Sequence, residues 1–355
     1  MKAGKSLVEL AQEIVRQNET KQDYIADTRK LSMFQNGEDF SLGIDDMNPF
    51  ALTEIAHDQI GERLKIPAAF YDRCREKYPD LLTHNVNSLF QREPTRQMIR
   101  TLDGNARAFL SERYRPIDHH EIAEAVLPII SNWMQEGATV ESAELTEKKL
   151  YIKVVNPRVQ AEIVTGDIVQ SGIVISNSEV GHGAVSVMPL VYRLVCSNGM
   201  ICADAGQRKN HVGRVNASDE NFTIYRDETR IADDRAFIMK LQDIVHAAAN
   251  EVHFERIVSI MRDSREAHIT NNDVPAVVQT VTKSYGLTES EGKGVLDHLI
   301  RGEELSLYGL ANSVTRHAQE SKSYDRSTEM EMIGFNILSM KRSTWNRFNE
   351  IKPAE

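Results

Sequence analysis

The stretch Asn177–Met200, with the sequence NSEVGHGAVSVMPLVYRLVCSNGM, decides the fold. Its middle part, Ala184–Cys196, is rich in valine and other apolar residues, which is typical of a strand in a protein core. The polar segment Asn177–Gly183 leads into this strand, and Ser197-Asn198-Gly199 follows it as a predicted exit turn. We therefore expect a core strand with unusual ends, in which Cys196 is a buried structural residue.

Further strands are predicted on the amino-terminal side of this one. Residues 138–145 (ATVESAEL) and 148–155 (KKLYIKVV) are typical of an antiparallel pair, and another strand is expected near Ile168–Ile175. The clearest hairpin is RQMIRTLDGNARAFLSERY, residues 96–114, in which Asp103-Gly104 supplies a tight turn. Because strands and helices do not alternate regularly, the sequence argues against a doubly wound parallel sheet.

Helices are predicted in front of these strands and between them. Leu7–Val15 has helical spacing, and three short helices are expected within residues 49–90. A short hairpin is expected around Asn36-Gly37. Asp118, with Glu121 three residues later, has the pattern of a capping box at the start of another helix.

A long helix is predicted from Arg214 to Val274, because this segment contains neither glycine nor proline. Its apolar residues recur close to a heptad repeat, at Ile231, Ile238, Leu241, Val245, Ala248 and Val252. We expect this apolar seam to pack on the protein's own domain, with self-association into a homo-oligomer as the alternative. Shorter helices are expected from Pro275 onward.

The sequence thus predicts an α+β fold, with an antiparallel sheet core between a helical amino-terminal part and a mostly helical carboxy-terminal part. We expect a helical region with a short hairpin over residues 1–92. The antiparallel core is expected over residues 93–213. The helical region of residues 214–355 is expected to pack on that core.

The bulk composition describes an ordinary globular chain. Its 355 residues are 41% hydrophobic and 26% charged, and the formal net charge is −10. This charge excludes a generally basic nucleic-acid coat, although a local basic groove is compatible with it. Three cysteines are too few for a disulfide framework, and the sequence shows neither a signal peptide nor an apolar run of about 20 residues. We expect a cytoplasmic protein without membrane contact.

Motifs of several common chemistries are absent from the sequence. It contains no GxxxxGK[ST], no GxGxxG after a strand, no HExxH and no GxSxG. Cys196, Cys202, His182 and His211 are of the types that zinc prefers, but their spacing matches no zinc motif. We therefore expect no metal and no cofactor, and the sequence favours a binding protein over an enzyme. The alternative is an enzyme of unknown reaction with a site around Glu179, His182, Cys196 and His211.

Three basic clusters contrast with the acidic average of the chain. The first lies between Arg92 and Arg115, where six arginines accompany three acids. The second is GQRKNHVGR, residues 206–214, and the third is MKRSTWNRFNEIK, residues 340–352, which includes Trp345. Such cations attract backbone phosphates, and aromatic rings stack on exposed bases. The expected nucleic-acid contacts are Arg107, Arg113, Tyr114, Arg115, Arg208, Lys209 and Arg214.

The polar segment is a further candidate site, with Asn177, Glu179 and His182 as its candidate residues. Gly181 and Gly183 permit backbone conformations that expose successive N–H groups to an anion. Glu179 and His182 also have the right types for an acid–base pair. The competing interpretation is a plain connection between two strands.

Several of these segments together resemble a known family. AFLSERYRPIDHHEI, GDIVQSGIVISNSEVGHGAVSVMPLVYRLVCSNGMI, RKNHVGR and LANSVTRHAQESKSYDRSTEMEMIG are similar to phage- and plasmid-associated bacterial proteins grouped as the domain of unknown function 932 family. The resemblance runs from about Phe50 to Gly334. Because the family has no assigned activity, it implies no catalytic residue. It implies a setting, mobile-element DNA, in which single strands are handled.

The leading hypothesis is a DNA-associated protein that binds single strands in a phage or plasmid replication or recombination system. A third hypothesis, besides the enzyme, is a host-directed interaction protein whose partner surface is the predicted helix of residues 214–274. The leading hypothesis requires the basic clusters to share one surface.

Overall fold

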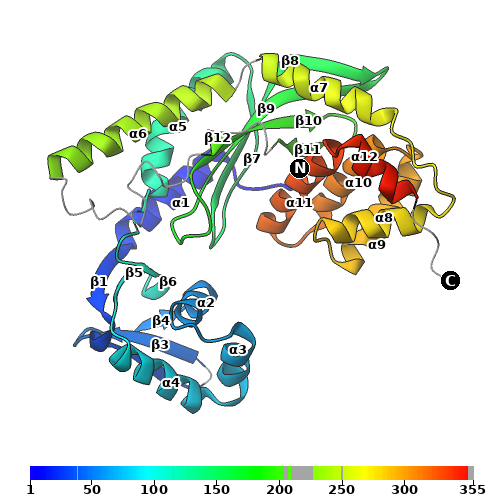
Figure 1. The fold of residues 1–355 in the computed structure, drawn as a ribbon. Coiled ribbons are helices and arrows are strands. Elements are labelled where there is room, and N and C mark those ends of the chain that lie inside the picture. Colours follow the sequence, from blue (N-terminus) through cyan, green and yellow to red (C-terminus); the bar gives the residue numbers. More distant parts are fainter. Residues whose placement is uncertain (38, 115, 203–206, 209–226, 249–250, 351–355) are drawn as a thin grey trace.

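The protein has an α+β fold in a computed structural model that describes residues 1–37, 39–114, 116–202, 207–208, 227–248 and 251–350. The described chain forms two mostly antiparallel sheets and a set of helices around them, which confirms the predicted fold class. Figure 1 shows an arch with the first sheet at one foot, the central sheet at the top and the carboxy-terminal helices at the other foot.

The first sheet has the strand order β1-β5-β6-β4-β3-β2, and its neighbours are antiparallel except for the parallel pair β4 and β6. Helices α2, α3 and α4 share one apolar core with this sheet, in which Phe90 stacks on Phe109 with ring centroids 5.9 Å apart. The bounds are β1 Gln22–Asp27, η1 Thr28–Lys30, β2 Leu31–Asn36, β3 Asp39–Ile44, β4 Phe50–Leu52, α2 Glu54–Arg63, α3 Ala68–Lys77, α4 Pro79–Arg92, β5 Arg96–Leu102 and β6 Asn105–Ser111.

The central sheet has the strand order β11-β10-β9-β8-β7, and the short β12 pairs with β10 on the edge that also carries β11. All of these pairs are antiparallel. The strands are β7 Thr139–Leu145, β8 Leu150–Val164, β9 Asp167–Asn177, β10 Ser186–Arg193, β11 Asn198–Ile201 and β12 Gln207–Arg208.

Helices cover both faces of the central sheet. On one face, α1 (Leu7–Thr20), α5 (His119–Gln135) and α6 (Asp227–Ala248) bury apolar side chains against the strands. On the other face, Met332 of α11 packs against strand residues that include Leu190. Burial on both faces explains why β10 is apolar over most of its length rather than alternating with polar residues.

The carboxy-terminal helices form a separate core, which includes Ile163 near the end of β8 and Val169 near the start of β9. Trp345 is 1% exposed and lies in this core. The helices are α7 Glu251–Arg265, α8 Val274–Ser284, α9 Glu289–Gly302, α10 Leu307–His317, η5 Ala318–Glu320, α11 Tyr324–Leu338 and α12 Arg342–Asn349.

The predictions of two hairpin turns and of the capping box at α5 are confirmed. Both expected hairpins form, and at the tip of the second one Asp103 and Gly104 have φ values of 51° and 79°. Such left-handed backbone at both central positions is what a tight hairpin turn demands. At the start of α5, the Asp118 N–H donates to Glu121 Oε2 at 2.9 Å, as a capping box requires.

The boundary expected at residue 92 cuts through the first sheet. Strand β5 pairs with β1 from Gln22↔Thr101 to Asp27↔Arg96, so the hairpin of residues 96–111 completes the amino-terminal sheet. Helix α1, which the prediction assigned to the amino-terminal region, instead packs on α5 and the central sheet. The two strands β1 and β5 pair although they are far apart in the sequence, because the edge of each strand gains backbone hydrogen bonds from the other.

The end of the decisive strand also differs from the prediction. Strand β10 ends at Arg193, the chain turns through Leu194–Ser197, and Asn198–Ile201 pairs back with β10 as β11. The expected exit turn is therefore mostly strand. Cys196 lies in the hairpin turn and is half-buried, so the expectation of a buried strand residue is wrong for it.

The predicted long helix is divided in the structure. Residues 214–226 and 249–250 lie outside the described residues, and the described part forms α6 and α7. Helix α7 ends at Arg265 instead of Val274, because the following chain pairs with the approach to α10. The Leu307 N–H donates to the Ala267 carbonyl oxygen at 2.8 Å, and the Ile269 N–H donates to the Leu305 carbonyl oxygen at 2.8 Å.

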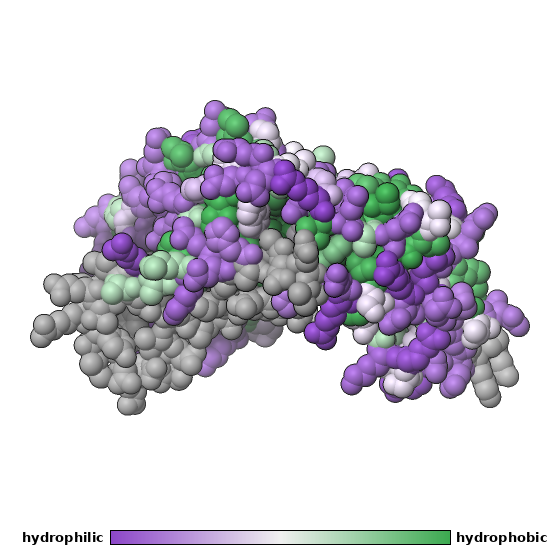
Figure 2. Space-filling model, turned by 90° about the horizontal axis from the view of Figure 1, so that it is seen from above, coloured by the Kyte–Doolittle hydropathy of each residue, from purple (hydrophilic) through white to green (hydrophobic). Residues whose placement is uncertain are grey.

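The described part of the apolar seam, Ile238, Leu241 and Val245, packs inside its own chain as predicted, while the side chains of Ile231, Ala248 and Val252 lie outside the described residues. Leu241 and Val245 are 3% and 0% exposed in the core beneath the central sheet. Figure 2 shows a face on which polar residues prevail and apolar residues emerge in separate groups. This burial removes Leu241 from the partner surface that the third hypothesis needs. In the part of the chain that the structure describes, no helix is both long and apolar enough to cross a bilayer.

Candidate functional site

The polar loop, Asn177–Gly183, connects β9 to β10 at one end of the central sheet. Ser178 holds this loop to the turn between β7 and β8, since its Oγ donates to the Lys148 carbonyl oxygen at 2.7 Å and accepts from the His182 N–H at 2.9 Å. From α2, Gln59 Nε2 donates to the Val180 carbonyl oxygen at 2.7 Å. The loop is therefore fixed in place by two other elements.

Two glycines give the polar loop its shape. Gly181 and Gly183 have φ values of 81° and 147°, in the region that favours glycine. A Cβ on Gly181 would lie 2.9 Å from Leu110 Cδ2, so a larger residue would also collide with β6. The sequence-based expectation of special backbone at these two positions agrees with this geometry.

The side chain of Glu179 is buried and is engaged by residues other than His182. Its carboxylate forms an ion pair with Arg107 and accepts a hydrogen bond from the His119 N–H at 2.5 Å, and the residue is 4% exposed. Arg100 Nη1 donates to the Glu179 carbonyl oxygen at 2.8 Å. These partners occupy the carboxylate, so the predicted acid–base pair of Glu179 and His182 does not form.

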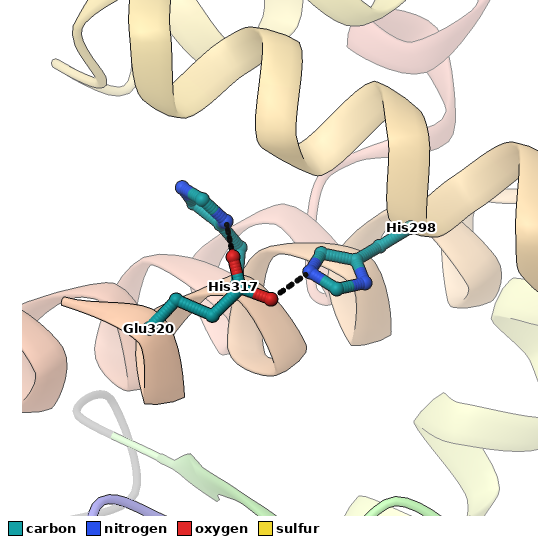
Figure 3. A group of neighbouring side chains, drawn as sticks. All are labelled: His298, His317 and Glu320. Atoms are coloured by element: carbon teal, nitrogen blue, oxygen red, sulfur yellow. Dashed lines mark hydrogen bonds and ion pairs between the residues drawn. The ribbon is translucent and has the colours of Figure 1, made fainter.

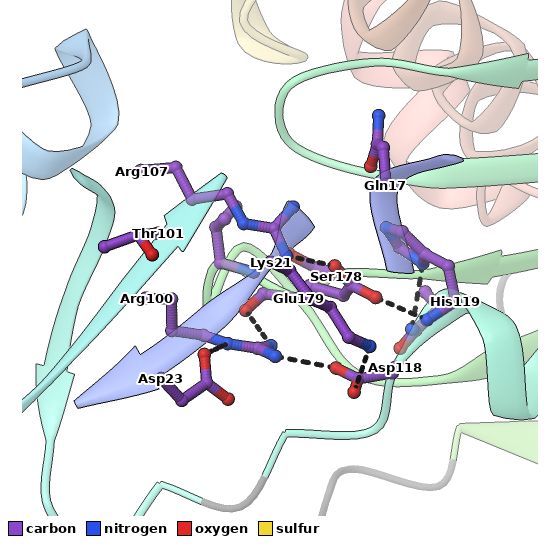
Figure 4. A network of polar contacts seen from close by, with 12 residues as sticks. Gln17, Lys21, Asp23, Arg100, Thr101, Arg107, Asp118, His119, Ser178 and Glu179 are labelled. Atoms are coloured by element: carbon purple, nitrogen blue, oxygen red, sulfur yellow. Dashed lines mark hydrogen bonds and ion pairs between the residues drawn. The ribbon is translucent and has the colours of Figure 1, made fainter. Parts of the chain in front are cut away.

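Glu179 belongs to a network of charges between the two sheets, shown in Figure 4. Arg100 is at its centre, with a side chain that is 0% exposed. Its Nε donates to Asp23 Oδ1 at 2.8 Å and its Nη2 to Asp118 Oδ1 at 2.7 Å, while Lys21 pairs with the other oxygen of Asp118. We call this set the junction network: Lys21, Asp23, Arg100, Arg107, Asp118, His119 and Glu179.

Electrostatics favour the charged forms of Asp118, Glu179 and Arg100 in the junction network. Burial favours the neutral carboxyl group of Asp118, but Arg100 and Lys21 outweigh burial and lower its pKa. Burial likewise opposes the charge of Arg100, and Asp23 and Asp118 raise its pKa above the ordinary value. The pKa of Glu179 is also lowered, because His119 and Arg107 outweigh its burial. The network is therefore a set of mutually compensating charges that joins the two sheets.

His119 is the neutral member of this network. Burial lowers its pKa to about 4, and Glu179 only partly offsets the effect, with Asp118 acting in the same sense and Arg107 and Arg100 against it. Its Nδ1 lies 3.1 Å from Asn177 Nδ2, which also donates to the Ile117 carbonyl oxygen at 2.8 Å. Asn177 thus anchors the start of the polar loop to the approach to α5.

Acidification is expected to destabilise the fold through His119 between pH 6.5 and about 4. The unfolded chain binds this proton near the ordinary pKa and the folded chain resists it, so the free energy of unfolding falls as the pH falls. The loss attributable to His119 is on the order of 3 kcal/mol. Chemical denaturation across this range measures it, and the His119→Gln variant should decline less steeply than the unchanged protein. Equal declines would contradict the role given to His119.

Two of the expected nucleic-acid contacts are engaged inside the protein. Arg107 is 9% exposed and paired with Glu179. Tyr114 packs on an apolar cluster with Leu110, and its hydroxyl donates to the Ser178 carbonyl oxygen at 3.2 Å. Burial raises the pKa of Tyr114 to about 12. Both residues therefore support the polar loop, and this placement argues against their predicted contacts with phosphate and base.

The remaining expected contacts are divided between surface and undescribed chain. Arg113 is exposed after β6, and its N–H donates to Ser111 Oγ at 3.3 Å. The backbone of Arg208 lies in β12. The expected contacts Arg115, Lys209 and Arg214, and His211 of the enzyme alternative, lie outside the described residues.

Strand β12 brings the second basic cluster to the polar loop. Arg208 is paired with Ser186 of β10, which is paired with Ser176 of β9, which in turn is paired with Tyr151 of β8. This row crosses the sheet at the end where the polar loop and the β7–β8 turn lie. The described residues of the second basic cluster, Gln207 and Arg208, therefore lie at the same sheet end as the polar loop.

Charges of both signs surround His182 at this end of the sheet. Burial and the neighbouring Lys148 and Lys149 lower the pKa of His182, while Asp58 and Asp325 act in the opposite direction. Lys148 is exposed and Lys149 is half-buried. The two lysines therefore add cations beside the polar loop to the buried Arg100 and Arg107, which contact Glu179.

The aromatic residues of the third basic cluster are packed in the core of the carboxy-terminal helices. Trp345 is 1% exposed among the carboxy-terminal helices, and Phe348 packs partly buried against the same core. Lys341, Arg342 and Arg347 remain exposed on and beside α12. Stacking of bases on Trp345 is therefore incompatible with this packing.

The residues of the enzyme alternative do not come together. His182 precedes β10 and Cys196 follows it, and the eight residues of Ser186–Arg193 separate the two ends by about 25 Å. Cys202 is 0% exposed in the core of the carboxy-terminal helices. A single reactive site that uses both His182 and Cys196 is excluded by this separation.

Arg100 and His119 are the central residues that sequence reasoning missed. The sequence presents Arg100 as one of the six arginines of the first basic cluster and His119 as the residue after the helix cap Asp118. Nothing local in the sequence marks them as buried, because their partners Asp23 and Glu179 lie 77 and 60 residues away. A group with metal-ligating residue types, His298, His317 and Glu320, lies elsewhere, among the carboxy-terminal helices.

Comparison with known proteins gives one family. A family model described as "Domain of unknown function (DUF932)" matches residues 108–345. No curated protein and no solved structure matches the chain significantly. The matched segment begins within β6 and ends within α12, so it contains the polar loop, the central sheet and most of the carboxy-terminal helices.

Proposed function

The chain belongs to the DUF932 family, and from that premise we propose that it binds nucleic acid at the end of the central sheet that carries the polar loop. Single-stranded DNA is the ligand we expect. The finer setting, replication or recombination of a phage or plasmid, follows the resemblance seen in the sequence and is part of the same proposal.

One observation carries the proposal. Strand pairing puts the backbone of Gln207 and Arg208, the described part of the second basic cluster, beside the polar loop, although the two are separate in the sequence. Lys148 and Lys149 reach the same place from the β7–β8 turn. Arg208 of β12 and the two lysines of the turn bring cations from two separate segments to one sheet end, which gives more contacts to a phosphate backbone than either segment alone.

The conformation of the polar loop is fixed by hydrogen bonds within the protein itself. The loop is held by the β7–β8 turn, which accepts a hydrogen bond from Ser178, and by Gln59 of α2 and Arg100 of β5, which donate to loop carbonyl oxygens. A fixed loop loses little conformational freedom on binding, so more of the interaction energy appears as affinity. The space beside Gly181 is filled by Leu110, so the anion contacts proposed here come from the cations around the loop and not from a nest at this glycine.

The acids at this end limit the size of the expected contact. Asp58 and Asp325 act on His182 together with the two lysines. Asp325 is engaged by the Tyr151 hydroxyl at 2.8 Å and by Thr146 Oγ1 at 3.1 Å. We therefore expect contact with a few phosphates and a marked sensitivity to salt, rather than the coating of a long tract.

A fluorescence-anisotropy titration with labelled oligonucleotides tests the proposal. The full chain should bind single-stranded DNA at low salt and bind a duplex of the same sequence more weakly. The Lys148→Ala/Lys149→Ala variant should bind the single strand less tightly, because each lysine contributes one counterion-releasing contact.

The matched control is Lys240→Ala/Lys293→Ala, which removes the same charge from exposed positions on α6 and α9. This control should bind like the unchanged protein. Equal weakening in both variants would mean that only the net charge matters, and the assignment to this sheet end would fail. Absence of any binding at low salt would remove the proposed function altogether.

A further inference from the structure

Three metal-ligating side chains from three elements converge among the carboxy-terminal helices. His298 comes from α9, His317 is the last residue of α10, and Glu320 ends the short η5. Figure 3 shows the Glu320 carboxylate between the two imidazole rings. His298 Nε2 lies 2.9 Å from Glu320 Oε1, and His317 Nδ1 lies 3.1 Å from Glu320 Oε2.

These distances suit a shared ion as well as hydrogen bonds. One donor atom from each residue lies within 4.8 Å of the other two. Zinc bound at about 2.1 Å in tetrahedral geometry holds its ligand atoms about 3.4 Å apart, so small side-chain movements complete the site. Glu320 is 57% exposed and free to make that adjustment, whereas His298 and His317 are 14% and 18% exposed and held by packing.

The backbone of α9 is shaped to admit the His317 ring. A Cβ on Gly294 would lie 2.2 Å from His317 Cε1, a distance that real atoms do not tolerate. Any side chain at this position would therefore push the imidazole away from His298. Glycine inside a helix lowers the stability of that helix. At position 294 glycine is required because α9 and the His317 ring approach each other closely.

A pocket of about 430 Å³ lies beside His298, the one residue of the three that lines it. It lies between the turn after β10 and helices α9 and α10, and His298 lines it together with Cys196, Tyr308 and Arg316. Arg316 Nη1 donates to the Cys196 carbonyl oxygen at 2.8 Å, which closes one side of the pocket. A ligand in this pocket could reach an ion held by His298.

We propose that His298, His317 and Glu320 bind one divalent transition-metal ion and leave a coordination position open toward this pocket. Two imidazoles and one carboxylate are a ligand set that zinc and non-haem iron(II) sites share. Three protein ligands with an open position are typical of ions that contact a small ligand, whereas structural zinc sites are closed by a fourth residue. This site is separate from the polar loop and does not depend on the proposed nucleic-acid binding.

Cobalt(II) and zinc titrations of the untagged full chain test the site after the protein is stripped with a chelator. Calorimetry should show one equivalent of zinc bound. Cobalt(II) should give visible absorption bands of a four- or five-coordinate site, and added azide should shift these bands through the open position. Glu320→Gln, at an exposed position, should weaken zinc binding by more than about 100-fold, since even indirect partners of metal sites contribute 10–100-fold.

Matched glycine variants separate a metal site from a simple hydrogen-bonded triad. Gly294→Ala should weaken zinc binding by displacing His317, whereas Gly302→Ala, on the same helix with open space around it, should not. His84→Ala removes an exposed histidine from α4 and should also leave binding unchanged. Failure of the unchanged protein to bind zinc or cobalt(II), or equal binding by Glu320→Gln, would overturn the proposal. Bands that azide does not shift would overturn the open position.

Discussion

Replacing Glu331 by glutamine is expected to lower the free energy of unfolding by about 3–5 kcal/mol. Glu331 Oε2 accepts a hydrogen bond from Lys153 Nζ at 2.6 Å, and the side chains are 1% and 0% exposed. Lys153 also donates to Thr328 Oγ1 at 3.1 Å, and its ammonium lies 4.9 Å from the centre of the Tyr324 ring. The substitution keeps the shape of the side chain but leaves the buried lysine charge without its counter-charge.

Two comparisons make this result specific to the buried pair. Replacing both partners, Lys153→Met with Glu331→Leu, should cost far less than the single change, because no charge is then left buried. Glu289→Gln, which breaks the exposed pair with Lys293, should have no measurable effect. Chemical denaturation gives all of these values. A single variant as stable as the unchanged protein would show that Lys153 finds another partner or water.

Replacing Glu179 by glutamine is expected to have the second large effect, again about 3–5 kcal/mol of unfolding free energy. Its carboxylate is the counter-charge of Arg107 and an acceptor for the His119 N–H, and it is almost fully buried. Removing the charge leaves Arg107 uncompensated inside the junction network. Because Arg100 holds the same residue through its carbonyl oxygen, the polar loop should stay attached but become more mobile.

Denaturation and hydrogen exchange together measure this effect. Amide exchange in the polar loop should accelerate in Glu179→Gln more than exchange in β8 or β9, since local opening comes before global unfolding. The control is Glu54→Gln, which breaks a pair between Arg75 and a 72% exposed glutamate and should change little. Exchange that accelerates uniformly over the chain would contradict the specific tie between Glu179 and the loop.

The parts of the fold that follow from local sequence were predictable. Asp103-Gly104 fixed its hairpin because only left-handed backbone closes a two-residue turn. Asp118 and Glu121 marked the start of α5 because their side chains serve the first N–H groups of that helix. The heptad-like residues Leu241 and Val245 indicated the buried face of α6 correctly.

The pairings of distant segments were not predictable in the same way. The hairpin of residues 96–111 belongs to the first sheet because β1 pairs with β5, and no local pattern records that choice. Lys153 is on the strand face opposite Leu150 and Ile152, but α11 covers that face 178 residues later in the chain and buries it. Cys196 was predicted in a strand but lies in a turn, because β11 pairs back onto β10 and the chain must turn between the two strands.

The candidate site shows the same division. The sequence marked the polar loop and the segment of residues 206–214 separately, and the pairing of β12 with β10 brings their ends together. Arg107 and Tyr114 were chosen by residue type, which cannot distinguish an exposed cation or ring from a buried one. His298, His317 and Glu320 were missed because His298 is 19 residues before His317, and packing of α9 on α10 is what joins them.

The salt dependence of single-strand binding is the most direct test of the central claim, that the polar-loop end of the central sheet contacts phosphates. The logarithm of the binding constant of the full chain should fall linearly with the logarithm of the salt concentration. In Lys148→Ala/Lys149→Ala the slope should be smaller by about 1.4, because each contact to a single strand contributes about 0.7. The same slope in the variant and the unchanged protein would contradict the claim, since the phosphates would then be bound elsewhere.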